Sequence, residues 1–236
     1  MIRLLPALLL LLLPVSAGAA DRTYSVGSFD RVRVEGPFQV QLLTGKSPGA
    51  RASGDTRVIE GLDIRVEGTT LLIRAGINGW GEQPVAGNKA APVITVSTSA
   101  IRGAIVIGGG RLSVTGPIRG QRIDLSVNGS GAIDAGAIQA DQFNATMLGS
   151  GSMKLGGRAA KVQLTTNGTG GIDATALSAS DLILLLDGPG EMRATARFTA
   201  KVTTTGLGAV TVYGSPACTV RAIAGGPVSC GKLPAP

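Results

Sequence analysis

The chain has 236 residues, of which 3% are aromatic and 36 are glycine, and it contains no histidine. The absence of histidine excludes the usual zinc sites and the Ser-His-Asp and Cys-His nucleophile systems. The formal net charge of +7 comes from basic residues that are scattered along the sequence rather than clustered, which argues against nucleic-acid binding.

The first twenty residues predict a secretory signal peptide. Arg3 is followed by an apolar run over residues 4–15 and then by small residues that end in Ala17-Gly18-Ala19, the pattern of a cleaved leader. The run is shorter than the roughly 20 residues that a transmembrane helix needs. We therefore expect residues 1–20 to be removed and the mature chain, without a transmembrane span, to be periplasmic, on the outer-membrane surface or extracellular.

Residues 21–100 predict an irregular β region. Segments such as RVRVEG, FQVQLL, LDIRVEG and VITVST alternate apolar with polar residues, and glycine-rich turns separate them. We expect these strands to pair with the repeats that follow and to cap the first edge of the stack. Residues 75–92 resemble a long loop that holds the only tryptophan, Trp80. Trp80 is the sharpest candidate for ligand contact, by stacking on a sugar, although a loop tryptophan more often packs onto its own domain.

A repeat of about 20 residues occupies residues 101–230, and its mark is a Gly-X-Gly phrase with apolar residues on both sides. The seven copies begin at Gly108, Gly129, Gly149, Gly168, Gly188, Gly206 and the degenerate Ala224. The steps between these anchors are 21, 20, 19, 20, 18 and 18 residues. Repeats of this length are typical of a solenoid.

The aligned copies have the periodicity of strands. Four residues before each anchor, and four and six residues after it, every copy carries an apolar residue or cysteine, as with Val220, Val228 and Cys230 in the last copy. Side chains two residues apart that share a face indicate a strand, and glycine suits a tight corner. The columns therefore predict seven coils of a parallel β-helix, with each Gly-X-Gly at a corner between two short strands.

The outward column between two inward ones alternates in charge. In the middle four copies it reads Asp134, Lys154, Asp173 and Arg193. Because adjacent coils lie about 4.8 Å apart, each charge would have opposite charges beside it. This arrangement avoids the like-charge neighbours that destabilise a sheet, so we expect a structural ladder.

The C-terminal end holds the only two cysteines, Cys218 and Cys230. An even number of cysteines in an exported protein favours a disulfide. Residues 231–236 form a tail whose prolines cannot continue a strand ladder. We expect this tail to end the stack and shield its last edge.

The segment SFDRVRVEGPFQVQLLTG, followed by LDIRVEGTTLLIRA, a loop with Trp80 and serial GSG repeats, resembles the head GIN domain of the putative auto-transporter adhesins. The similarity extends from about Phe29 to Val228. It implies an exported bacterial protein of adhesin type with a right-handed parallel β-helical fold. We accordingly expect one such domain over residues 21–230, with regular coils over 101–230.

The sequence predicts no catalytic, cofactor or metal site. A phosphate-binding glycine loop leads into a helix, whereas here another strand follows. Calcium would need carboxylates where Lys154 and Arg193 stand, and Asp187 with Glu191 is the only other near cluster of acids.

We therefore predict a non-catalytic, exported, adhesin-like or polymer-binding module without cofactors. Its expected partners are glycans or other envelope or host-surface molecules. One alternative is a carbohydrate-active enzyme, which would need carboxylates that converge beside Trp80 or the N-terminal loops. Another is a periplasmic structural scaffold.

Overall fold

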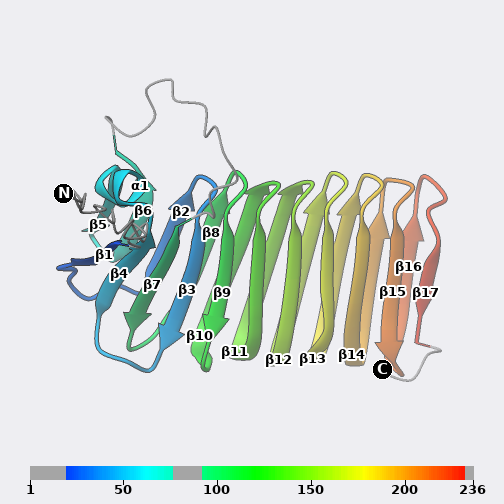
Figure 1. The fold of residues 1–236 in the computed structure, drawn as a ribbon. Coiled ribbons are helices and arrows are strands. Elements are labelled where there is room, and N and C mark those ends of the chain that lie inside the picture. Colours follow the sequence, from blue (N-terminus) through cyan, green and yellow to red (C-terminus); the bar gives the residue numbers. More distant parts are fainter. Residues whose placement is uncertain (1–19, 77–91, 232–236) are drawn as a thin grey trace, which may run out of the picture.

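The computed structural model describes residues 20–76 and 92–231. The predicted leader, the loop with Trp80 and the KLPAP tail lie outside these residues. The structure is 72% strand and 3% helix, and its strands stack as a β-solenoid of about six turns with about 20 residues per turn (Figure 1). Seven corner phrases bound six complete turns, so the seven copies in the sequence correspond to six turns.

The N-terminal region contains seven strands and one short helix. They are β1 (Ala20–Tyr24), β2 (Arg31–Glu35), β3 (Gln39–Thr44), β4 (Gly49–Gly54), α1 (Thr56–Glu60), β5 (Leu62–Glu67), β6 (Thr70–Ala75) and β7 (Val93–Thr98). The β2–β3 turn is inserted in parallel between β6–β7 on one side and β8–β9 of the repeats on the other. The prediction that these strands pack onto the same stack is thus confirmed.

The antiparallel strands β1, β4 and β5 and the helix α1 lie at the N-terminal end of the stack (Figure 1). The sequence analysis did not predict α1, because five residues are too few to display helical periodicity. Asp55 caps the helix by accepting a hydrogen bond from the backbone amide of Arg57, and Ile59 is buried. Among the described residues, none of the helical structure is long and apolar enough to cross a membrane.

The repeats form the regular part of the solenoid. Their strands are β8 (Gly103–Ile107), β9 (Arg111–Thr115), β10 (Ile118–Gly129), β11 (Ala132–Gly149), β12 (Ser152–Asn167), β13 (Gly171–Asp187), β14 (Glu191–Thr204), β15 (Ala209–Gly214), β16 (Ala217–Ala222) and β17 (Val228–Cys230). Every neighbouring pair within this set is parallel.

Each turn has two faces and two edges. The ladder face consists of β9, β15, β17 and the first four residues of β11–β14, and it continues into β3, which pairs with β9. The trough face consists of β8, β16 and the parts of β10–β14 that run from Arg122, Gln142, Lys161, Asp181 and Thr199 to the strand ends. The Gly-X-Gly phrases form the glycine edge. At the opposite edge the chain turns through residues 118–121 and their counterparts 138–141, 157–160, 177–180 and 196–198.

The prediction of two short strands per turn is wrong for the middle turns. Strand β11 has 18 residues and runs from the ladder face, around the second edge and onto the trough face. It keeps its pairing with β12 through this bend, with a register shift between Ala135 and Ile138. Because that edge preserves the backbone ladder, no break separates the two faces.

The core is a single column of mainly aliphatic side chains that continues from Phe29 to Val212 and includes three phenylalanines. The predicted inward positions are buried in the middle turns, as at Ile133 and Leu164, and Phe143 is among the largest fully buried side chains. The prediction that Val220 points into the core is wrong, because Val220 is 45% exposed. It lies in β16, which pairs with β14 and forms part of the last described turn, where no further turn within residues 20–76 and 92–231 covers the interior.

The glycine edge brings successive backbones into close contact. Gly129 has a φ of +119°, in the region that disfavours other residues. A Cβ atom at Gly131 would lie 2.6 Å from the carbonyl oxygen of Gly110 and 2.8 Å from Cγ1 of Val106. The repeated phrase is therefore a steric requirement of stacking one corner on the next.

Replacing Gly131 with alanine is expected to lower the free energy of unfolding by about 1–3 kcal/mol, because the added methyl group overpacks the corner. Urea denaturation followed by circular dichroism measures this change. The matched control is Gly136→Ala, where a Cβ would meet nothing within 4 Å and where a change within about 0.5 kcal/mol is expected. Equal losses in the two variants would contradict the steric explanation.

Candidate binding surface

The charge-alternating column lies on the ladder face. The strand register places Asp134 opposite Lys154, Lys154 opposite Asp173, and Asp173 opposite Arg193. The ion pair that Arg193 forms is with Glu191 of its own strand, at 2.7 Å. Within this column, Arg193 is thus neutralised by an acid of its own strand, whereas Asp134 and Lys154 form no ion pair among the described residues.

Asp173 is the most strongly held carboxylate of this column. The backbone amide and hydroxyl of Thr175 both donate to its Oδ1, at 3.1 and 2.7 Å. Burial raises the pKa of the Asp173 carboxyl, but these hydrogen bonds and the positive charges of Arg193 and Lys154 outweigh burial and lower it below its ordinary value.

Asp173→Asn is expected to reduce the free energy of unfolding by up to about 1 kcal/mol at pH 7. The pKa of this carboxyl is lower in the folded state, so its contribution is present near neutral pH and is lost as the pH falls through the folded-state value. Urea titrations of both proteins should thus converge at pH 2. The control is Asp134→Asn, because Asp134 has no hydrogen bond within the described residues, and its effect at pH 7 should be smaller. A difference that persists at pH 2 would refute this account.

Cys218 and Cys230 lie in β16 and β17, in the last turn, with their sulfur atoms bonded at 2.06 Å. The other near pair of acids, Asp187 and Glu191, is engaged separately. Asp187 accepts hydrogen bonds from Asn167 and Thr205, and Glu191 pairs with Arg193. The structure gives this pair no shared contact that would support chemistry.

Two adjoining depressions lie on the other side of the solenoid. The first, of about 370 Å³, follows the second edge across β10–β14, and its lining includes the small residues Gly120, Ala140 and Ala159. The second, of about 640 Å³, crosses β11–β14 and β16 on the trough face. They meet where consecutive residues line one and the other, as at Ala160 and Lys161. Each spans five strands, which corresponds to roughly 19 Å.

The lining of the trough-face depression combines hydrogen-bonding groups with apolar side chains, of which Ile183 is 41% exposed. The amides of Gln142 and Gln163 and the ammonium groups of Lys161 and Lys201 are exposed there. Asp181 also lines it, and its carboxylate accepts a hydrogen bond of 2.6 Å from the hydroxyl of Thr199.

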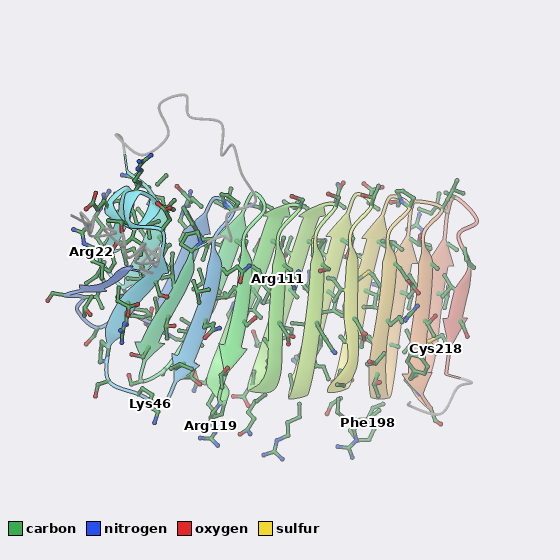
Figure 2. All side chains as sticks on the ribbon, in the orientation of Figure 1. Arg22, Lys46, Arg111, Arg119, Phe198 and Cys218 are labelled. Atoms are coloured by element: carbon green, nitrogen blue, oxygen red, sulfur yellow. A yellow bond between two sulfur atoms is a disulfide. The ribbon has the colours of Figure 1, made fainter. Side chains whose placement is uncertain are left out.

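Neither depression was predicted from the sequence. The sequence analysis described the basic residues as scattered, yet the second edge gathers Arg119, Arg158 and Arg197 from separate repeats. Figure 2 shows Arg119 and Phe198 projecting from this edge, which is the lower one in that view. The signal that could have found it is the spacing, because these arginines recur every 39 residues, or about two repeats. Trp80, the predicted ligand contact, lies outside the described residues.

Within the described ranges, no group of three or more His, Cys, Asp or Glu side chains gathers where it could hold a metal ion. The two depressions together offer hydrogen-bonding and charged groups over an extended area. Such an arrangement suits recognition of a long partner at many points rather than capture of one small molecule.

A protein-family model described as "Putative auto-transporter adhesin, head GIN domain" matches residues 28–216. The chain belongs to this family. Among the described elements, the match covers α1 and the strands from β2 to β15, whereas β1 precedes it and β16 and β17 follow it. No curated protein matches the chain by sequence.

Solved structures share the fold of this head GIN domain. A putative adhesin from Bacteroides fragilis is 20% identical, with a TM-score of 0.82 and coverage of 91% of this chain and 97% of that chain. A putative lipid binding protein from Parabacteroides distasonis is 18% identical over the same shares, with a TM-score of 0.73. A putative adhesin from Parabacteroides merdae is 14% identical, with a TM-score of 0.70 and coverage of 91% and 96%. At these identities the similarity shows the fold alone.

Proposed function

We propose that this head GIN domain is an exported, non-catalytic binding module of the bacterial cell envelope or cell surface. Its partner is an extended polymer, with glycans as the first class to test. The observation that carries this proposal is the pair of adjoining depressions, each of which crosses five strands. A polymer that lies along the solenoid axis would meet equivalent positions of successive turns at regular intervals.

The membership of an adhesin family supports this role at a coarse level. The chemistry of the trough face supports the finer one, because side-chain amides, hydroxyls and ammonium groups pair well with the hydroxyl groups of sugars. A surface that repeats the same positions from turn to turn also suits a long partner, as in other solenoids.

Binding to immobilised polysaccharides tests the proposal. Gln142→Ala with Gln163→Ala removes two exposed amides of the trough face, and retention of a bound polymer should weaken about tenfold from the lost hydrogen bonds. The matched control is Gln39→Ala with Gln41→Ala, which removes two exposed amides from β3 on the ladder face. Failure of the wild-type protein to bind any polymer of a broad panel, or equal losses in both double variants, would overturn the proposal.

Export is the second part of the proposal, supported by the predicted leader over residues 1–20. Protease treatment of intact cells, followed with an antibody and with a periplasmic protein as control, separates the locations. Digestion in intact cells is expected for a surface adhesin. Protection until the outer membrane is opened would contradict surface display and would move the search for partners to the periplasm.

A further inference from the structure

The second edge of the solenoid concentrates arginines in alternate turns. Arg119 of β10 lies opposite Gln139 of β11, which lies opposite Arg158 of β12, and Arg158 lies opposite Ser178 of β13. Arg158 and Arg197 of β14 both line the depression of about 370 Å³ that follows this edge. Because each step between strands is about 4.8 Å, arginines two strands apart are separated by about 10 Å along the axis.

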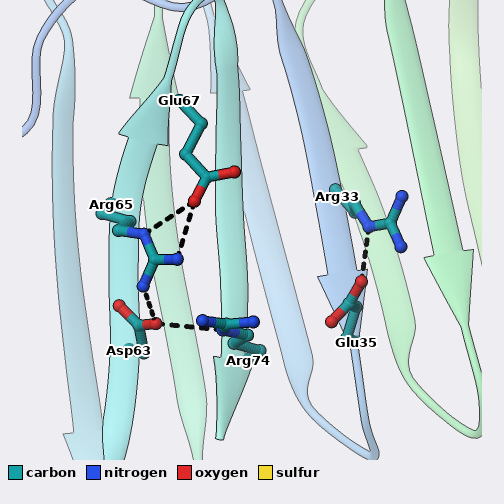
Figure 3. Close-up of polar contacts among 6 residues, drawn as sticks. All are labelled: Arg33, Glu35, Asp63, Arg65, Glu67 and Arg74. Atoms are coloured by element: carbon teal, nitrogen blue, oxygen red, sulfur yellow. Dashed lines mark hydrogen bonds and ion pairs between the residues drawn. The ribbon is translucent and has the colours of Figure 1, made fainter. Parts of the chain in front are cut away.

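Seven of the described arginines away from the second edge are paired with carboxylates. At the N-terminal end Arg65 contacts both Asp63 and Glu67, and Arg74 contacts Asp63 at 3.0 Å (Figure 3). Arg33, Arg51, Arg102, Arg122 and Arg193 are also paired with acids. Pairing of this kind leaves little charge for a partner to neutralise.

Three arginines without an ion pair gather at the second edge, whereas the other unpaired arginines of the described structure lie on separate elements: Arg22 on β1, Arg31 on β2, Arg57 on α1, Arg111 on β9 and Arg221 on β16. Among the described residues, none of Arg119, Arg158 and Arg197 forms an ion pair. Arg119 donates instead to the neutral amide oxygen of Gln139, at 3.0 Å. The depression has one acidic residue in its lining, Asp141. Guanidinium groups without protein anions are the groups best suited to bind carboxylate or sulfate from outside.

Phe198 adds an apolar contact at the same edge. Its side chain is 59% exposed, and the guanidinium carbon of Arg197 lies 5.1 Å from the centre of its ring. An exposed ring beside a depression with small side chains offers a stacking surface for a sugar ring. Ser178 and Ser180 also line the depression and can hydrogen-bond sugar hydroxyls.

We propose that the second edge, with Arg158 and Arg197 as its principal anion contacts, binds a polysaccharide that carries carboxylate or sulfate groups. The inference rests on the proposed function and narrows its partner to an anionic glycan. Arg119 and Arg158 lie two strands apart in one row, and Arg197 lines the depression two strands beyond Arg158, so a linear chain that follows the edge would meet a guanidinium group at every second strand. A recessed line of charge suits a single chain better than a membrane, whose headgroups form a broad plane.

Binding to immobilised polygalacturonate, dextran sulfate and neutral dextran tests this inference. The wild-type protein should bind at least one charged polymer at least tenfold more tightly than dextran, and this binding should weaken with added salt. Arg158→Gln with Arg197→Gln should lose about tenfold or more of that affinity. Arg111→Gln with Lys154→Gln removes the same charge from β9 and β12 on the ladder face, and it should change affinity less than twofold. Thermal unfolding by circular dichroism verifies that both variants fold.

Each contrary result has a distinct meaning. Equal losses in the two double variants would overturn the inference in favour of general charge attraction. Tight binding of dextran that the Arg158 and Arg197 changes leave intact would overturn the anionic inference while the proposed polymer-binding function stands. Absence of binding to these polymers and to the wider panel would overturn both. Binding to phosphatidylglycerol vesicles without binding to any polymer would replace the glycan with a membrane surface.

Discussion

The parallel backbone ladder between successive turns is the constraint on which the rest of the structure depends. Each turn must follow nearly the same path as its neighbour, because its amides and carbonyls pair with that neighbour over most of their length. The glycine edge sets how closely the turns approach, because a Cβ atom at glycines such as Gly131 would collide with the corner of the preceding turn. Equivalent positions then fall into straight rows, inside as a continuous aliphatic column and outside as rows of polar groups.

The parts of the fold that the sequence predicted lie close to the repeated phrase. Ile133 and Asp134 could be placed on opposite sides of a strand by counting from Gly129, and the same count places Lys154 beside Asp134. The second edge has no repeated phrase from which to count. Register shifts between Ala174 and Ser178 show that the turns differ in length there, so the neighbours of Arg197 could not be derived from its position in the repeat. The exposure of Val220 was missed because periodicity says nothing about where a stack ends.

The two faces differ in how completely their polar groups are used. On the ladder face, Asp173 and Arg193 interact with groups of the same protein, whereas Arg111 and Lys154 form no ion pair within the described residues. On the trough face and the second edge, Lys161, Lys201 and Arg158 face solvent without ion pairs in the described structure. The interior and the corners constrain the backbone, whereas these outer rows do not.

A stack in which each turn packs mainly on its two neighbours behaves as a one-dimensional array, and its free energy is close to a sum over adjacent pairs. Interior turns are held from both sides, but the final turn has a single neighbour and is the place where fraying begins. At the N-terminal end, α1 and the antiparallel strands supply contacts beyond the regular array. At the C-terminal end, the bond between Cys218 and Cys230 joins the two strands of the last turn across 12 residues of sequence. A covalent closure of that loop restricts the frayed ensemble, so the disulfide acts where cooperative melting of the array would otherwise start.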